Sequence, residues 1–137
     1  MLNSKKPILL VEDDRIDAMS VKRSLQELKI VNDLIIRNNG EEALKYLLDS
    51  ENEIPCIILL DLNMPKMNGI DFLSERIKYD NLKLIPTVVL TTSREEQDRV
   101  NSFSLGVSGF MIKPVDYKQF VDVIKTIDLY WSLSELP

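Results

Sequence analysis

The sequence has 137 residues, 45% of them hydrophobic, and its 22 acidic and 17 basic side chains give a net charge of -5. This length supports one ordinary hydrophobic core, so we expect a single domain over residues 1–137, with a core at about 7–131 and a short C-terminal extension at 132–137. A negative protein lacks the basic surface that binding to a phosphate backbone requires. We therefore expect no direct nucleic-acid binding.

The cysteine and histidine counts narrow the chemistry further. The single cysteine, Cys56, lies in an apolar run and cannot form an intramolecular disulfide, so we interpret it as a core residue of a protein from a reducing compartment. The polar N-terminus and the brief apolar run that follows it fit neither a signal peptide nor a membrane span. We expect a cytoplasmic protein with no membrane partner. The sequence contains no histidine, so any phosphohistidine must come from another protein.

Short apolar runs alternate with amphipathic stretches along the chain. The apolar runs predict strands covered on both faces, and in chain order they are 8–11, 34–36, 57–60, 88–90 and 110–112. The amphipathic stretches predict five helices, with apolar positions at 18–28, 43–48, 70–77, 100–103 and 120–131. This alternation predicts a doubly wound α/β fold, with a five-stranded parallel sheet in the order 2-1-3-4-5 and helices on both faces.

Several polar residues are explained by local structure. Asp14 precedes the first helical stretch and is expected to cap it, with Asp17 three residues later. Ser93 starts a capping-box pattern after the fourth strand and is expected to cap the next helix. Asn68 marks the start of the third helix. These residues are therefore not needed to explain a functional site.

Acidic residues follow the first and third strands, which are neighbours in the predicted sheet. Glu12 and Asp13 come after the first strand, and Asp61 comes after the third. Ligand sites of such sheets lie beyond the carboxyl ends of the strands, at the point where the strand order reverses. Crowded carboxylates need a proton or a cation, and oxygen ligands favour Mg²⁺ or Mn²⁺. Helix capping alone would not explain three acids at this point.

The fourth and fifth strands end in groups that suit a phosphate. Thr91 ends the fourth strand and offers a hydroxyl donor, and Lys113 follows the fifth and offers an ammonium. Together with the acids, this edge of the sheet is predicted to hold a nucleophile, a metal site, a cation and a hydrogen-bond donor.

This combination resembles the receiver domain of bacterial two-component response regulators, which has a flavodoxin-like fold, and the resemblance extends from Ile8 to about Trp131. The matching positions are Glu12, Asp13, Asp61, Asn63, Pro65, Gly69, Thr91, Lys113 and Pro114. The resemblance implies that Asp61 is the phosphorylated carboxylate. It also implies that Mg²⁺ is bound by Asp13, Asp61 and the main-chain carbonyl of Asn63, and by Glu12 largely through water.

The same resemblance implies how the domain switches. Lys113 would pair with Asp61 and then with the phosphoryl group, while Thr91 and Phe110 would move after phosphorylation. The Lys113–Pro114 peptide bond would be cis. The segments 89–93 and 130–137 resemble those of the small stand-alone regulators of bacterial phytochrome-type kinases.

The resulting hypothesis is a stand-alone response regulator of a phosphorelay. It would accept a phosphoryl group from a sensor histidine kinase or a phosphotransfer protein, act on a downstream protein target and release phosphate by autodephosphorylation, without being an enzyme in the ordinary sense. Exposed Tyr130 and Trp131 leave open a homodimer through the face formed by the fourth predicted helix, the fifth strand and the last helix.

Other functions fit less well. An aspartate-nucleophile phosphohydrolase would use similar groups, but such enzymes resemble Asp-x-Asp at the nucleophile, and here the third position is Asn63. A receiver-like interaction module that needs no phosphorylation is a further alternative. A dinucleotide-binding domain is disfavoured, because the four glycines form no G-x-G-x-x-G pattern after the first strand.

Overall fold

The computed structural model describes residues 5–133 and has a five-stranded parallel sheet at its centre. The strands are β1 (Ile8–Val11), β2 (Leu34–Arg37), β3 (Ile57–Leu60), β4 (Thr87–Thr91) and β5 (Gly109–Ile112). Their order across the sheet is β2-β1-β3-β4-β5, and all four neighbouring pairs are parallel. The predicted doubly wound sheet is confirmed.

Six helices accompany the strands within residues 5–133, one more than the sequence predicted. They are α1 (Arg15–Glu27), α2 (Gly40–Leu48), α3 (Gly69–Arg76), α4 (Asp80–Lys83), α5 (Glu96–Ser104) and α6 (Tyr117–Leu133). The additional helix is α4, a single turn without a side-chain N-cap. Four residues are too few to show a helical period, which is why the sequence did not reveal it.

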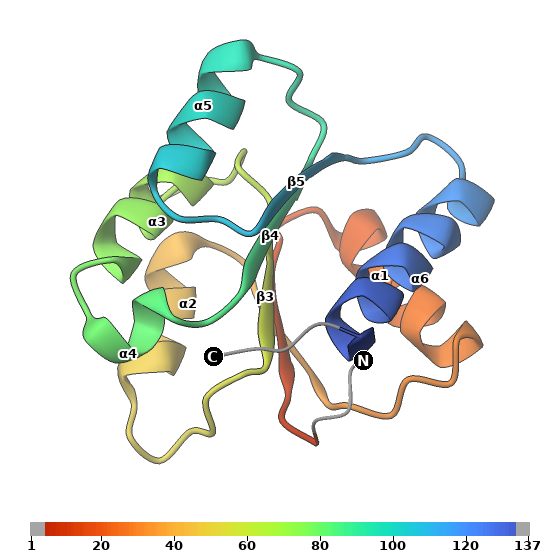
Figure 1. The fold of residues 1–137 in the computed structure, drawn as a ribbon, viewed down its shortest axis with the longest axis horizontal. Coiled ribbons are helices and arrows are strands. Elements are labelled where there is room, and N and C mark those ends of the chain that lie inside the picture. Colours follow the sequence, from red (N-terminus) through yellow and green to blue (C-terminus); the bar gives the residue numbers. More distant parts are fainter. Residues whose placement is uncertain (1–4, 134–137) are drawn as a thin grey trace.

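The helices form two layers on opposite faces of the sheet (Figure 1). Helices α1 and α6 cover one face, and α2, α3, α4 and α5 lie on the other. Alternate residues of the central strands supply the two cores, because successive side chains of a strand point to opposite faces. On β1, Ile8 and Leu10 pack toward α1 and α6, whereas Leu9 and Val11 pack toward α2 and α3. Burial on both faces explains the continuous apolar runs.

The edge strands and α5 differ from the predicted burial. β2 and β5 have one neighbouring strand each and are only half-buried, so the expectation that both are covered like interior strands is wrong. Val100 and Phe103 of α5 are each 50% exposed, although their spacing suggested a core-facing helix; the buried residue of α5 is Ser102. A spacing of three residues fixes a helix face but does not say which way that face points.

The end of α6 corrects a further expectation. Trp131 is only 8% exposed and packs into the core beside α1, whereas its neighbour Tyr130 is 59% exposed. The expectation that Trp131 is exposed is therefore wrong, and its place on the apolar stripe with Phe120 and Ile124 is confirmed. Helix α6 reaches Leu133, and the rest of the predicted extension lies outside the described residues.

Helix starts agree with the sequence at two of three positions. Asp14 caps α1, accepting hydrogen bonds from the backbone N–H groups of Ile16 and Asp17, and Asn68 caps α3. Ser93 does not cap α5: its hydroxyl donates to the Asp98 carboxylate at 2.6 Å, and the helix begins only after Glu95. The prediction failed because two non-helical residues, Arg94 and Glu95, separate Ser93 from the first residue of α5. Within residues 5–133, no helix has the length and apolar character to cross a membrane.

Candidate functional site

Three acidic side chains meet at the carboxyl ends of β1 and β3, as the sequence predicted. Glu12 and Asp61 each extend the parallel ladder by one residue, because Glu12 N–H donates to Arg37 O and Asp61 N–H donates to Val11 O. Their side chains therefore lie side by side and are buried, whereas Asp13 is exposed. One carboxylate oxygen from each of Glu12, Asp13 and Asp61 lies within 4.8 Å of the others. This cluster is called the acidic pocket below.

Lys113 enters the acidic pocket from the end of β5. Its backbone N–H donates to Thr91 O at 2.8 Å, which continues the ladder between β4 and β5. Its side chain is only 5% exposed, and its Nζ lies 2.5 Å from Glu12 Oε1 and 3.7 Å from Asp61 Oδ2. The predicted proximity of Lys113 to the acids is therefore confirmed.

Asp17 is a residue of this site that the sequence did not reveal. Lys113 Nζ donates to Asp17 Oδ2 at 2.8 Å, across 96 positions of the chain. The sequence marked Asp17 only as an acid in the first turn of α1, where acids are common because of the helix dipole. Nothing in that local pattern points to a partner on β5.

The electrostatics of the pocket reflect burial and crowding. Burial, together with the charge of Asp61, raises the pKa of Glu12 from 4.5 to about 7, although the hydrogen bond from Lys113 opposes the rise. Burial alone would lower the pKa of Lys113, but its hydrogen bonds to Asp17 and Glu12 outweigh burial and raise the pKa above its usual value. A proton on Glu12 therefore relieves the repulsion when no cation is bound.

The acidic pocket fits a divalent cation. Within residues 5–133, Asp61 Oδ1 is a buried oxygen without a hydrogen-bond partner, and an ion can satisfy such an atom where the protein does not. The ligand atoms are carboxylate oxygens, which suit hard cations with oxygen coordination. The arrangement can hold a cation beside a nucleophilic carboxylate and an ammonium group.

Close backbone contacts fix the loop between β3 and α3. A Cβ atom on Gly69 would lie 2.6 Å from Asp61 O and 2.7 Å from Leu62 Cα, so only glycine fits there. The N–H of Gly69 donates to Leu62 O at 3.0 Å and closes the loop. Asn63, whose main-chain carbonyl the family resemblance assigns to the metal, is an exposed residue of this loop.

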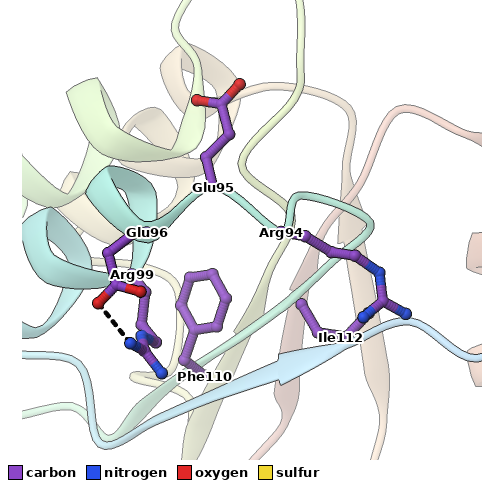
Figure 2. A pocket seen from close by; sticks show the side chains of 6 residues that line it. All are labelled: Arg94, Glu95, Glu96, Arg99, Phe110 and Ile112. Carbon is purple, nitrogen blue, oxygen red and sulfur yellow. Dashed lines mark hydrogen bonds and ion pairs between the residues drawn. The ribbon is translucent and has the colours of Figure 1, made fainter.

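Thr91 and Phe110 lie on the two neighbouring strands beside the pocket. Thr91 is fully buried at the end of β4, and its Oγ1 accepts a hydrogen bond from the N–H of Ser93 at 3.2 Å. Phe110 on β5 is half-buried and lines a cavity of about 270 Å³ beside the start of α5. Figure 2 shows that the Phe110 ring lies between Arg99 of α5 and Ile112 of β5, and that Arg99 forms an ion pair with Glu96.

The peptide bond before Pro114 differs from the prediction. Residues 5–133 contain no cis peptide bond, so the Lys113–Pro114 bond is trans and the predicted cis bond is wrong. A trans bond before proline is intrinsically favoured by about 0.5–1 kcal/mol, and no local feature of the sequence indicated the opposite.

Comparison with known proteins places this fold and site in a family. The family model of the response regulator receiver domain matches residues 8–125 of this chain. The chain belongs to this family, whose members are switches of two-component signalling. Its fold and its acidic pocket are thus those of a signalling receiver, which disfavours the phosphohydrolase and dinucleotide-binding alternatives.

The similar proteins include a phytochrome response regulator. Response regulator Rcp1 of Synechocystis sp. is 38% identical over 133 residues, covering 94% of this chain and 90% of that protein. The structure of the phosphorylated cyanobacterial phytochrome response regulator RcpA is similar with a TM-score of 0.89 and 33% identity, covering 98% of this chain and 99% of that one. The Mn²⁺-bound form of Rcp1 gives a TM-score of 0.88 and 36% identity, covering 96% and 99%.

Proposed function

We propose that this receiver domain accepts a phosphoryl group on Asp61 from a phosphohistidine of a partner protein. The observation that carries the proposal is the state of Asp61: its carboxylate lies in the acidic pocket, Oδ1 has no hydrogen-bond partner within residues 5–133, and Lys113 Nζ is 3.7 Å from Oδ2. Asp61 thus has one oxygen free to meet a metal ion or an incoming phosphoryl group, while the other faces the Lys113 ammonium. The partner is a sensor histidine kinase or a phosphotransfer protein, because this chain has no histidine of its own.

The transfer of the phosphoryl group from the phosphohistidine to Asp61 needs no further reactant. An Asp61 carboxylate oxygen forms a bond to phosphorus, the P–N bond to the imidazole breaks, and the imidazole nitrogen keeps the electron pair. Lys113 and the Thr91 hydroxyl, which lie at the same edge of the sheet, would stabilise the phosphoryl oxygens. Water later attacks phosphorus, the P–O bond to Asp61 breaks, and the carboxylate and phosphate are released. The domain thereby returns to its starting state.

The cation of this site is Mg²⁺ in our proposal, with Mn²⁺ as a substitute. Glu12, Asp13, Asp61 and the main-chain carbonyl of Asn63 would hold it, and it would neutralise charge on the transferring oxygens. The support is the oxygen-only ligand set of the acidic pocket and its similarity to the Mn²⁺-bound Rcp1 structure. Oxygen ligands with open water positions suit Mg²⁺.

Phosphorylation would change the surface formed by α5, β5 and α6. Thr91 would turn toward the phosphoryl group and give up its bond to the N–H of Ser93, and Phe110 would leave the cavity shown in Figure 2 for the space behind Thr91. The phosphoryl group favours that arrangement only through contacts it makes there and not in the resting state. A downstream protein target, or a second copy of this chain, would recognise the altered surface.

The surface next to the pocket suits docking of the phosphohistidine donor. Ile16 is 78% exposed and Met19 is 52% exposed on α1, and both line a groove of about 660 Å³. Arg15, Lys22 and Arg23 line the same groove. This apolar centre with a basic border, on a protein of net charge -5, fits a partner surface with apolar and acidic residues.

Action as a stand-alone regulator and a cytoplasmic location remain predictions from the sequence.

Mass spectrometry of the protein after treatment with acetyl phosphate and Mg²⁺ tests the proposal. We expect one phosphoryl group on the wild-type chain, located at Asp61, and none on the Asp61→Asn variant. Chelation of the metal should prevent labelling of the wild type. An unmodified Asp61, under conditions that label another receiver domain, would overturn the proposal and leave the phosphorylation-independent interaction module as the better interpretation.

A further inference from the structure

Lys113 has more partners than its role beside Asp61 requires. It contacts Glu12 at 2.5 Å and Asp17 at 2.8 Å, but its distance to Asp61 Oδ2 is 3.7 Å, beyond the range of a normal hydrogen bond. The ammonium is therefore held nearer to Asp17 than to the nucleophile. Asp17 is not a member of the acidic pocket and comes from a different element, helix α1.

The contact between Asp17 and Lys113 is not an ordinary surface ion pair. The side chain of Lys113 is 5% exposed and that of Asp17 is 30% exposed, so solvent screens the pair less than it screens exposed pairs. The cap of α1 also fixes Asp17, because its backbone N–H donates to Asp14 Oδ1 at 3.0 Å. Both partners are thus held in place by backbone contacts.

The charge of the site gives this contact a consequence. A divalent cation and one lysine together match the three acids of the acidic pocket. Asp17 is a fourth carboxylate at the site and, after Glu12 and Asp61, the third that pairs with the Lys113 ammonium, and an incoming phosphoryl group adds further negative charge. A phosphoryl group on Asp61 would therefore share the charge of the Lys113 ammonium with Asp17 as well as with Glu12.

We propose that Asp17 is a positioning residue that holds the Lys113 ammonium on the α1 side of the acidic pocket and so weakens its contact with a phosphoryl group on Asp61. The inference deepens the proposed function and rests on it. Asp17 thereby sets how readily the resting domain gains a phosphoryl group, without touching that group. The resting state holds Lys113 through Asp17, and the phosphorylated state must release part of that contact.

Titration calorimetry with beryllofluoride and Mg²⁺ tests this inference, since beryllofluoride is a non-covalent mimic of the phosphoryl group. Asp17→Asn keeps the shape of the side chain and removes its charge, so we expect beryllofluoride to bind about fivefold more tightly. This gain corresponds to part of the free energy of one charge-assisted hydrogen bond. Asp17→Glu keeps the charge and should bind within about twofold of wild type.

Asp71→Asn is the matched control. Asp71 is also an acid in the first turn of a helix, α3, and it is exposed. Its substitution removes one negative charge from the first turn of a helix, as Asp17→Asn does, but removes no contact with Lys113. We expect less than about a twofold change in beryllofluoride affinity for this variant, and equal tightening in both Asn variants would overturn the inference.

Two further measurements separate positioning of Lys113 from a simple change of electric field. In a Lys113→Met background, Asp17→Asn should no longer tighten beryllofluoride binding; the same tightening there would overturn the inference. The ¹⁵N resonance of the Lys113 ammonium in the metal-free protein should shift in Asp17→Asn and stay in place in Asp71→Asn. An unshifted resonance in Asp17→Asn would also overturn it. If the wild type itself binds no beryllofluoride, the proposed function fails instead.

Discussion

Glu12 determines how the acidic pocket responds to pH. Its pKa lies at about 7, raised by burial and by the charge of Asp61, whereas an unfolded chain would lose this proton near 4.5. In the metal-free protein, the folded state holds the proton more tightly, so the free energy of unfolding falls as the pH rises from 4.5 to about 7. A cation that binds the carboxylate must displace the same proton.

Metal affinity should therefore depend on pH through Glu12. We expect the affinity for Mg²⁺ or Mn²⁺ to fall about fivefold to tenfold between about pH 7.5 and about pH 6, because the ion then competes with a bound proton. Calorimetric titrations across this range measure the effect. Glu12→Gln should bind the ion more weakly but with a nearly flat pH profile. A profile as steep in Glu12→Gln as in wild type would show that another group controls binding.

The positions of site residues that directly follow strands could be predicted from the sequence. The position of a residue that depends on how one element packs against another, far along the chain, could not. Glu12, Asp61 and Lys113 follow directly after apolar runs, so the sheet order alone brings them together. The pairing of Asp17 with Lys113 depends on how α1 packs beside the end of β5, and no local pattern encodes that contact. The bond before Pro114 is the opposite case: the family resemblance implies a cis bond, whereas the bond is trans, as the intrinsic preference favours.

At the scale of elements, the N-terminus of α2 supports the loop that follows Asp61. The N–H of Gly40 donates to Met67 O at 2.9 Å, and a Cβ atom at this position would lie 2.8 Å from the same oxygen and 3.0 Å from Phe72 Cβ. One of these atoms belongs to backbone, so the clash cannot be relieved by a flexible side chain. The close approach of α2 to the loop requires glycine.

Gly40→Ala should destabilise the protein by about 1–3 kcal/mol, because the added methyl group overpacks this contact. Urea unfolding measures the loss. Gly109→Ala is the control, since the nearest atoms to its Cβ are Val88 methyl carbons at 3.7 Å, an ordinary contact, and it should change the stability by less than about 0.5 kcal/mol. Equal midpoints for the two variants would contradict the steric argument.

Arg76 joins α3 to two other helical segments from a fully buried position. It is 1% exposed, burial lowers its pKa, and its guanidinium donates to the carbonyl oxygens of Lys83, Ile85 and Leu105. It therefore satisfies carbonyl groups at the ends of α4 and α5. In sequence, Arg76 is simply a basic residue in the last turn of α3, and nothing local indicates these three contacts.

Arg76→Met should lower the free energy of unfolding by about 1–3 kcal/mol, because buried carbonyl groups lose their donors. Arg99→Met is the matched comparison: Arg99 forms an exposed pair with Glu96 on α5, and its loss should cost less than about 0.5 kcal/mol. Thermal and urea unfolding of both variants test the difference. A similar loss in both would mean that the buried hydrogen bonds add little net stability.

At the scale of the whole molecule, the sheet order follows from the alternation of strand and helix, but the exposure of α5 does not. The apolar runs of β1, β3 and β4 lie between two helical layers, and such burial leaves a strong pattern in sequence (Figure 1). Val100 and Phe103 have the same spacing as core residues, yet half of each side chain faces solvent. Sequence cannot distinguish a core-facing pair from a surface-exposed one when both are apolar.

The acidic pocket should lower the stability of the whole metal-free protein. Three carboxylates crowd together there, and Asp61 Oδ1 lacks a hydrogen bond within residues 5–133. Asp61→Asn removes one of the charges, so we expect the free energy of unfolding of the metal-free protein to rise by about 1–2 kcal/mol at neutral pH. Mg²⁺ should raise the stability of the wild type, because it binds the folded state alone, and should have little effect on Asp61→Asn.

Urea unfolding with and without Mg²⁺ measures both effects in one experiment. Trp131 is the only tryptophan and lies buried between α6 and the sheet, so its fluorescence reports loss of the core at a distance from the substituted site. Without metal, Asp61→Asn should have the higher free energy of unfolding. As Mg²⁺ is added, the free energy of unfolding of the wild type should rise toward that of the variant and then exceed it. If Asp61→Asn is less stable than wild type without metal, the contact of Asp61 with Lys113 outweighs the repulsion among the acids.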